Sequence, residues 1–393
     1  MDFEIGWNRF NLTLLGVWPE PRKMSRGSRF LSSLIFWSTT FVAFAFICAP
    51  QTANLILKSS NLDEIIENLS INIPIAFALV KQIVLRYYKE ALSLLLGQML
   101  DDWSEPIGDQ ARRTMLKNAR ISRTISIVCS TLTYLMLLAF ISLQIWSNTQ
   151  NASQVDLAGL LHPATFPYDK GKSPNFEITW LGQFMSTVLT AICYSCFDMF
   201  LAVLVLHLCG QLTVLRMALE DLVNATKRTD YSNFHQQLGF IVQRHNQLYR
   251  FAIVVEDCFN LTLLVQTIIC TAMLCLTGYR MITSVDQKGE KLPIIGMIFF
   301  TTHVIYTMLH LFIYCYVGEM LLRQSTGIGQ SVYDCNWYDL RPKQAVSLII
   351  VMCRAKVSFQ ITAGKFSPFS LEFFNAVLKT SAGYLSVLLA MKD

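Results

Sequence analysis

Seven stretches of mainly apolar residues, each long enough to cross a lipid bilayer, dominate this sequence. A helix rises 1.5 Å per residue, so about 20 apolar residues span the hydrocarbon core of about 30 Å. Hydrophobic residues make up 53% of the chain and charged residues only 15%, against about 25% charged in a typical soluble domain. The sequence therefore predicts an all-α membrane protein with seven transmembrane helices, at residues 30–50, 65–86, 122–146, 177–208, 252–280, 292–317 and 370–391.

Three further segments are expected to be helical outside the bilayer. The apolar run 345–361 contains Arg354 and Lys356, so we interpret it as a helix packed at the inner membrane face rather than as an eighth span. Segments 235–251 and 318–325 continue the helical pattern of the neighbouring spans. We expect these helices to project into the cytoplasm and to pack there.

The Lys and Arg residues are distributed unevenly between the two sets of connecting segments. Twenty fall in the N-terminal segment and in the connections on the same side, and seven fall on the opposite side. Because positively charged loops are retained in the cytoplasm, we expect a cytoplasmic N-terminus and, after seven spans, an extracellular C-terminus. No cleavable signal pattern is visible at the N-terminus, so the first span is expected to stay in the product.

The last predicted span is more polar than a simple membrane anchor. Its polar residues recur at spacings of three, four and seven, which places them on one stripe of a helix: Glu372, Asn375, Lys379 and Ser386. An adjoining stripe carries Thr380, Val387 and Met391. A spanning helix with a polar stripe is expected to pack against protein or to face water rather than lipid.

No catalytic, metal-binding or cofactor-binding motif is visible. The six His are scattered, and most of the eleven Cys lie inside apolar segments, so we expect buried thiols rather than a disulfide framework. The net charge of +5 does not by itself indicate nucleic-acid binding. We therefore expect no enzymatic activity, no cofactor, no metal and no nucleic-acid partner. In the outer loop 147–176, Asn151 begins the N-glycosylation sequon that this topology would expose.

Four ionisable residues fall within or near the ends of the predicted spans: Lys81, Asp198, Glu256 and Asp257. Charged groups are costly in a bilayer unless they are paired, so they are expected to face the interior of the bundle or its inner rim. We interpret them as ion pairs or packing contacts that lock helices together, and an ion pathway is the alternative.

The outer halves of predicted spans two to six combine aromatic, Met and small residues with a few polar groups. Such a lining is typical of a pocket for a small, mostly apolar ligand, and ordinary helix packing is the alternative. The candidate ligand-binding residues are Ile73, Phe77, Ala139, Ser142, Trp146, Met185, Leu189, Phe299, Thr302, His303 and Tyr306.

The C-terminal third of the chain resembles a known family. Three consecutive segments are similar to the corresponding part of insect odorant receptors: GEMLLRQSTGIGQSVYDCNWYDL (318–340), MCRAKVSFQITAGKFSPFSLEFF (352–374) and NAVLKTSAGYLSVLLAM (375–391). The segment RHNQLYRFAIVVEDCFNLTLLVQ (244–266) resembles the entry to the fifth span of this family. A short N-terminal helix with Gly16 and Pro19 before the first span also fits.

The resemblance implies an odorant-gated, non-selective cation channel in the plasma membrane of a sensory-neuron dendrite. Members of this family assemble as tetramers, normally with a shared co-receptor subunit, through a cytoplasmic anchor formed by the inner extensions of spans four to seven. We therefore expect a six-helix bundle with the odorant pocket in its outer half (1–317), an anchor helix with a linker (318–369) and a pore-lining last helix (370–393).

The resemblance also assigns pore residues. Val387 and Met391 fall where the family has its hydrophobic gate, and we expect Thr380, Gly383 and Tyr384 to line the same pore. A hydrophobic constriction can gate by dewetting, so a small outward movement of the last helix would open it.

In the third span, the resemblance supports three of the pocket candidates. Ala139, Ser142 and Trp146 match a small-small-Trp arrangement in a pocket of this family. The other candidates rest only on the face of the helix on which their spacing places them. The third inner connection (209–250) has 42 residues and lacks the long insertion of the co-receptor, so the chain resembles a ligand-specific subunit. The inner helix has no Pro at 357–358, where many members carry one.

Three other classes of seven-helix protein remain as alternatives. A gustatory-receptor-like channel has the same fold, but Gly383-Tyr384 and Ala390-Met391 replace its terminal motifs. A metabotropic receptor would have the opposite orientation. A secondary transporter should show two repeated halves with broken helices, and no such repeat is visible.

Overall fold

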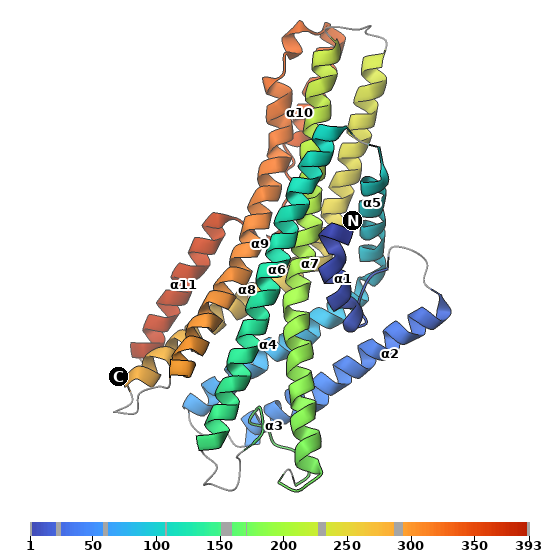
Figure 1. Cartoon of the computed structure of the whole chain (residues 1–393). Helices are drawn as coiled ribbons and strands as arrows, with labels where there is room; N and C mark the ends of the chain where they lie inside the picture. The colour runs from blue at the N-terminus through green and yellow to red at the C-terminus, as the bar shows by residue number, and fades with distance from the viewer. Residues whose placement is uncertain are drawn as a thin grey trace.

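The structure of the 393-residue chain is a computed structural model. It describes residues 2–20, 25–57, 62–106, 108–150, 159–169, 171–226, 233–286 and 294–390. Within these ranges the chain is almost entirely helical, with one two-stranded antiparallel sheet (Figure 1). In chain order the elements are α1 (Asp2–Leu14), α2 (Arg26–Ala43), the π-helical turn η1 (Phe44–Cys48), α3 (Ala49–Leu57), α4 (Leu62–Tyr87), α5 (Lys89–Ser104), α6 (Asp109–Gln150), α7 (Asn175–Thr226), α8 (Phe234–Asp286), α9 (Ile294–Asp334), the 3-10 turn η3 (Trp337–Asp339), α10 (Pro342–Ala355), β1 (Thr362–Ala363), β2 (Ser367–Pro368) and α11 (Leu371–Ala390).

Seven helices of the described chain are long and apolar enough to cross a membrane, which confirms the predicted number of spans. The first combines α2, η1 and α3, and the others are α4, α6, α7, α8, α9 and α11. They run alternately in opposite directions, so the C-terminal end of α11 lies at the end of the bundle away from α10 (Figure 1).

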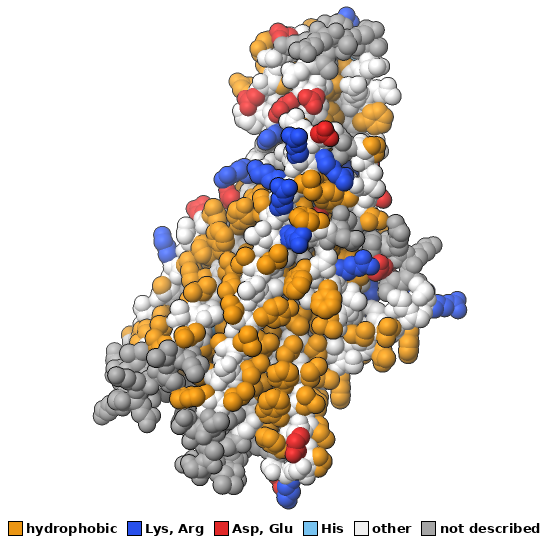
Figure 2. Space-filling view, viewed as in Figure 1, with side chains coloured by type: hydrophobic (Ala, Val, Ile, Leu, Met, Phe, Trp, Pro, Cys, Tyr) orange, Lys and Arg blue, Asp and Glu red, His pale blue; other side chains and the backbone are white. Residues whose placement is uncertain are grey.

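Basic side chains gather near the α10 end of the molecule, above a broad hydrophobic surface (Figure 2). This arrangement matches the uneven distribution of Lys and Arg on which the predicted orientation rests. Most of the basic residues assigned to the opposite side fall outside the described residues: Lys58, Lys170, Lys288, Lys291 and Lys392. The orientation of the bundle in the membrane therefore stays a prediction.

The first span changes from α2 to α3 through the turn η1. Pro50 follows this turn; it has no backbone N–H, and in a regular α-helix its ring would clash with the carbonyl of Phe46. A wider π-helical turn before the proline accommodates it. Phe46 then lies against Gly182 of α7, where any Cβ atom would overlap the Phe46 ring.

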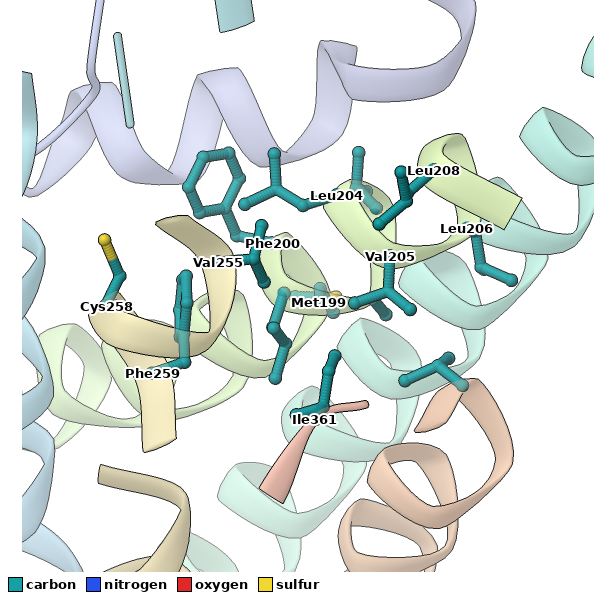
Figure 3. Packing of buried hydrophobic residues seen from close by; sticks show 14 of the residues in the cluster. Met199, Phe200, Leu204, Val205, Leu206, Leu208, Val255, Cys258, Phe259 and Ile361 are labelled. Atoms are coloured by element: carbon teal, nitrogen blue, oxygen red, sulfur yellow. The ribbon is translucent and has the colours of Figure 1, made fainter. Parts of the chain in front are cut away.

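The helix α7 is the centre of the core. In the most apolar 18-residue stretch of α7, 72% of the residues are buried, against 22% in the corresponding stretches of the first span and of α6. A helix that is apolar on all sides is expected to be buried on all sides, and Phe197 and the run 199–206 have almost no exposed surface. Figure 3 shows Met199, Phe200 and Val205 of α7 packed with Val255 and Phe259 of α8.

Four helices extend far beyond the length that a bilayer requires. One is α6, with 42 residues, and the other three meet at the α10 end. α7 has 52 residues, α8 has 53 and α9 has 41, whereas about 20 residues suffice to cross the hydrocarbon core. Their extensions and α10 enclose a second apolar cluster, with Leu219, Leu222, Val223, Phe234, Leu238, Val332, Leu340, Leu348 and Val351. The predicted helical extensions are confirmed, and residue 318, taken as the start of the anchor, lies inside the continuous helix α9.

The inner helix ends earlier than predicted. α10 ends at Ala355 rather than at 361, and the chain then forms the β1–β2 hairpin. Gly364 in the turn has a φ of +60° and donates its N–H to the carbonyl of Asn260 at 3.0 Å. Glu256 of α8 accepts hydrogen bonds from the backbone N–H and hydroxyl of Thr362. The hairpin is therefore fastened to α8 immediately before α11.

Buried polar contacts hold α1 against the bundle. Glu4 accepts a hydrogen bond from Trp103 Nε1 at 2.9 Å, and its carboxylate lies 3.6 Å from His207 Nδ1. The other ring nitrogen of His207 lies 3.0 Å from Asp102, which also binds Arg244. This chain of contacts joins α1, α5, α7 and α8.

Candidate functional site

A cavity of about 220 Å³ lies between five of the spanning helices, in the half of the bundle away from α10. This volume is below the range of about 300–1,000 Å³ common for drug-sized ligands, so the cavity suits a smaller molecule. Its walls are Ser70, Ile71, Pro74 and Ile75 of α4; Thr133, Met136, Leu137, Phe140, Leu143 and Gln144 of α6; Thr187, Thr190, Ala191 and Tyr194 of α7; Met273, Thr277 and Arg280 of α8; Phe299, Phe300, His303, Tyr306 and Thr307 of α9; and His162 of the α6–α7 loop.

Three of the eleven predicted pocket residues line this cavity, all on α9. Phe299, His303 and Tyr306 are separated by four and three positions, so they share one face of the helix. The rings of Phe299 and His303 are stacked with centroids 6.1 Å apart. Thr302 lies on a neighbouring face and is not part of the lining. The face of α9 that carries most of its predicted pocket residues is therefore the face that lines the cavity.

The three candidates on α6 lie on another face of their helix. Ser142 and Trp146 are exposed and Ala139 is half-buried, and none of them lines the cavity. The lining face of α6 instead carries Phe140 and Leu143. The small-small-Trp arrangement therefore does not face the cavity in this chain.

The remaining candidates are also outside the lining. Phe77 is 4% exposed and packs with Ile269 and Met273, with Ile73 against the same cluster. Of these, Met273 lines the cavity, so Ile73 and Phe77 support its wall from behind. On α7, Met185 is exposed and Leu189 packs against the main core.

Several polar side chains on the cavity wall pair with one another. His303 Nδ1 lies 2.9 Å from the hydroxyl of Thr277, and Thr133 Oγ1 lies 3.4 Å from the hydroxyl of Tyr306. Pro74 has no backbone N–H, so the carbonyl of Ser70, four positions earlier, receives no helical hydrogen bond from it. Both residues line the cavity. The wall thus offers a few hydrogen-bonding groups within an apolar surface.

The sequence did not predict the loop residue His162. Its side chain is 1% exposed, and its backbone N–H and carbonyl both bind the side-chain amide of Gln183, at 3.1 and 3.3 Å. The signal that could have indicated burial is the apolar pair Leu160-Leu161 directly before it in an otherwise irregular loop. Leu161 is likewise 1% exposed.

A charged cluster lies behind the cavity. Lys81 Nζ lies 2.6 Å from Asp198 Oδ1, and His310 Nδ1 lies 2.5 Å from the other carboxylate oxygen. Lys81 also lies 3.8 Å from the ring centroid of Tyr194, which lines the cavity. The predicted ion-pair lock is confirmed for Lys81 and Asp198.

The other two charged candidates lie in different surroundings. Glu256 is half-buried and binds the β-hairpin as described above. Asp257 is exposed, with Lys365 at 3.4 Å, so it forms an ion pair without facing the interior of the bundle. Both residues therefore contact the hairpin, Glu256 at Thr362 and Asp257 at Lys365 in the turn.

The last helix, α11, touches the rest of the chain on one side only. Val377 and Ser381 are buried against α8 and α9, while Thr380, Gly383, Tyr384 and Val387 are exposed. In its most apolar 18-residue stretch, only 11% of the residues are buried. Two predicted site residues, Met391 and Asn151, lie outside the described residues.

Comparison with known proteins assigns the chain to a family. A family model described as 7tm Odorant receptor matches residues 61–382. The chain belongs to the odorant receptor family. Membership and the seven spans make it a multi-pass protein of the plasma membrane and a receptor rather than an enzyme.

Individual relatives are distant in sequence. Odorant receptor 13a of Drosophila melanogaster is 27% identical over 242 residues, which cover 57% of this chain and 55% of that protein. Odorant receptor 2a of Drosophila melanogaster is 22% identical over 353 residues, covering 86% and 85%. The odorant receptor coreceptor of Harpegnathos saltator is 28% identical over 155 residues, covering 39% and 31%. The chain thus spans about half of the first relative and about a third of the coreceptor.

Solved structures share the whole fold. The insect olfactory receptor OR5 from Machilis hrabei, determined in complex with eugenol, has a TM-score of 0.81 to this odorant receptor. The alignment covers 100% of both chains at 15% sequence identity. This similarity shows a common fold across the complete chain.

Proposed function

We propose that this odorant receptor is the ligand-specific subunit of an odorant-gated, non-selective cation channel. A small, mostly apolar volatile occupies the cavity, and the pore is lined by α11 together with its counterparts in neighbouring subunits. The observation that carries the proposal is that α11 takes no part in the cavity wall and leaves most of its surface free. Ligand binding and ion conduction are therefore assigned to different helices of one chain.

A short structural connection joins the two regions. Thr277 lines the cavity and contacts His303, and the next residue, Gly278, faces α11. A Cβ atom at Gly278 would come within 2.9 Å of Leu385. A ligand that shifts α8 at Thr277 would therefore displace α11 beside Tyr384 and Val387, because packed helices move as units.

The exposed face of α11 fits a pore lining. It carries Thr380, Gly383, Tyr384 and Val387, with Met391 following on the same stripe in the sequence. These side chains combine small polar and apolar groups, as expected for a water-filled path closed by a hydrophobic constriction. A ring of Val387 and Met391 from four subunits is the proposed gate.

The partner subunit is proposed to be the shared co-receptor. The similarity to co-receptors covers 39% of this chain, and the connection between α7 and α8 is short, as expected of a ligand-specific subunit. The proposed contact region is the cluster of α7, α8, α9 and α10 at the basic end, placed in the cytoplasm by the proposed orientation. Asn151 on the opposite side is the proposed glycosylation site.

The test is current recording from cells that express this chain with a co-receptor, over a panel of small volatiles. The proposal requires ligand-evoked cation currents that need both subunits and persist when G-protein signalling is blocked. Currents abolished by that block would favour a metabotropic receptor instead. An epitope at the C-terminus, detected on intact cells, tests the orientation, and staining only after permeabilisation would contradict it.

A further inference from the structure

His162 belongs to the cavity lining, and its imidazole carries a buried nitrogen, Nδ1, without a hydrogen-bond partner in the described chain. Buried polar atoms in folded proteins are nearly always paired, so an unpaired one points to a missing partner. The cavity is the space from which such a partner can come.

The surrounding contacts hold this ring in place. Gln183 binds both backbone groups of His162, Thr187 lies 2.8 Å from its Nε2, and Phe140 stacks on its face with centroids 5.1 Å apart. The loop is fixed further by Thr165, whose N–H donates to the carbonyl of Pro50. The nitrogen is thus positioned before any ligand binds, which lowers the ordering cost of recognition.

The contacts also determine what the free nitrogen can do. The Thr187 hydroxyl donates its single proton to the carbonyl of Gln183 at 2.7 Å, so it must accept from His162 and Nε2 must carry a proton. A neutral imidazole has one protonated nitrogen, which leaves Nδ1 as an acceptor. Burial lowers the pKa of His162 to about 3, so the ring stays neutral at physiological pH.

We propose that His162 Nδ1 accepts a hydrogen bond from a hydroxyl group of the ligand, so that this receptor prefers small apolar alcohols and phenols to the corresponding ethers. This inference rests on the proposed function and names the ligand class of the same cavity. An ether places a second acceptor against Nδ1 and leaves both unpaired. A carboxylate has no proton to donate, and an ammonium group would share the cavity with the cation of Arg280.

The test compares matched pairs of probes on cells that express this chain with a co-receptor. The probes are 1-octanol and its methyl ether, and 2-phenylethanol and its methyl ether. For the wild type, we expect the alcohol to activate at a concentration at least about tenfold lower than its ether, because an unpaired buried acceptor is costly. In His162→Phe, which keeps a flat ring but lacks the acceptor, that ratio should fall to about one.

Two further variants test the tautomer of His162 and control for the substitution itself. Thr187→Val removes the group that fixes the tautomer, so Nδ1 can also carry the proton and the ethers should gain relative to the alcohols. His235→Phe makes the same substitution at an exposed site on α8, far from the cavity, and should retain the wild-type ratio. Equal ratios in wild type and His162→Phe would overturn the inference.

Ligand-induced thermal stabilisation of the purified complex, measured with the same pairs, separates this inference from the proposed channel function. Stabilisation by alcohols over ethers without any evoked current would support the role of His162 and contradict the channel. Evoked currents with no preference between pair members would support the channel and overturn the role of His162.

Discussion

Lys81 Nζ on α4 lies 2.6 Å from Asp198 Oδ1 on α7, and the two side chains are 0% and 3% exposed. Lys81 also donates to the backbone carbonyl of Tyr194 at 3.3 Å, while Asp198 binds His310 of α9. The pair therefore joins three helices directly behind the cavity. Removing one charge would leave the other buried without its ion partner.

We expect Lys81→Met to destabilise the receptor by about 3–5 kcal/mol, because a buried charge loses its partner. Lys81→Met combined with Asp198→Asn should recover most of this loss, since Asn keeps an acceptor for His310 and both charges of the Lys81–Asp198 pair are removed. Thermal unfolding of the purified receptor measures both. As a control, Lys365→Met breaks an exposed pair with Asp257 and should change stability by less than about 1 kcal/mol. A double variant no more stable than Lys81→Met would contradict this account.

Val387→Ala should change the ion selectivity or raise the basal current of the assembled channel without lowering surface expression. Val387 is 59% exposed in the single chain, so the substitution leaves no cavity within the subunit. Leu138→Ala on α6, where the side chain is 61% exposed, is the control for a pore-independent effect. If selectivity and leak were unchanged with Val387→Ala, the proposed gate would be wrong.

Gly278→Ala should press on Leu385 and shift the concentration dependence of activation with little effect on folding. The added Cβ would lie 2.9 Å from the flexible end of Leu385, which can move with α11. Leu385→Ala in the same chain makes room for the Cβ and should return the response toward that of Leu385→Ala alone. Purely additive effects in this double-mutant cycle would argue against a connection at this point.

Gly364→Ala should destabilise the receptor by about 1–3 kcal/mol. The residue has a φ of +60°, and its Cβ would lie 2.6 Å from Leu264 Cδ2, so the hairpin would shift away from α8. Gly239→Ala on α8 has nothing within 4 Å of the new Cβ and should be neutral or slightly stabilising. Thermal unfolding distinguishes the two, and equal effects would contradict the assigned role of the turn.

Acidification should destabilise the receptor through His162. The unfolded chain binds a proton at this residue below pH 6.5, whereas burial lowers the pKa in the folded chain to about 3. Because the unfolded state binds more protons in this window, the free energy of unfolding falls as the pH falls from 6.5 toward 3, by about 1.4 kcal/mol per pH unit. His162→Phe should lose this contribution, so the stability difference between the two proteins should change with pH below 6.5 and stay constant above it.

The number of spans, their alternation and the long helical extensions could be predicted from the sequence alone. These features follow from local chemistry, because about 20 apolar residues need a bilayer and the extensions repeat the helical pattern. The sequence also predicted that charges within the bundle form ion pairs or packing contacts, since a buried charge requires a partner. It did not indicate that Lys81 pairs with Asp198.

Which face of each helix lines the cavity depends on how the helices pack against one another. On α9 the predicted residues Phe299 and His303 do line the cavity. On α6 the lining face carries Phe140 instead of the predicted Ser142. In a membrane protein the lipid-facing side is as apolar as the interior, so hydrophobic periodicity does not distinguish them. His162 reaches the cavity through contacts between a loop and α7 that no local pattern encodes, because they join residues 21 and 25 positions apart.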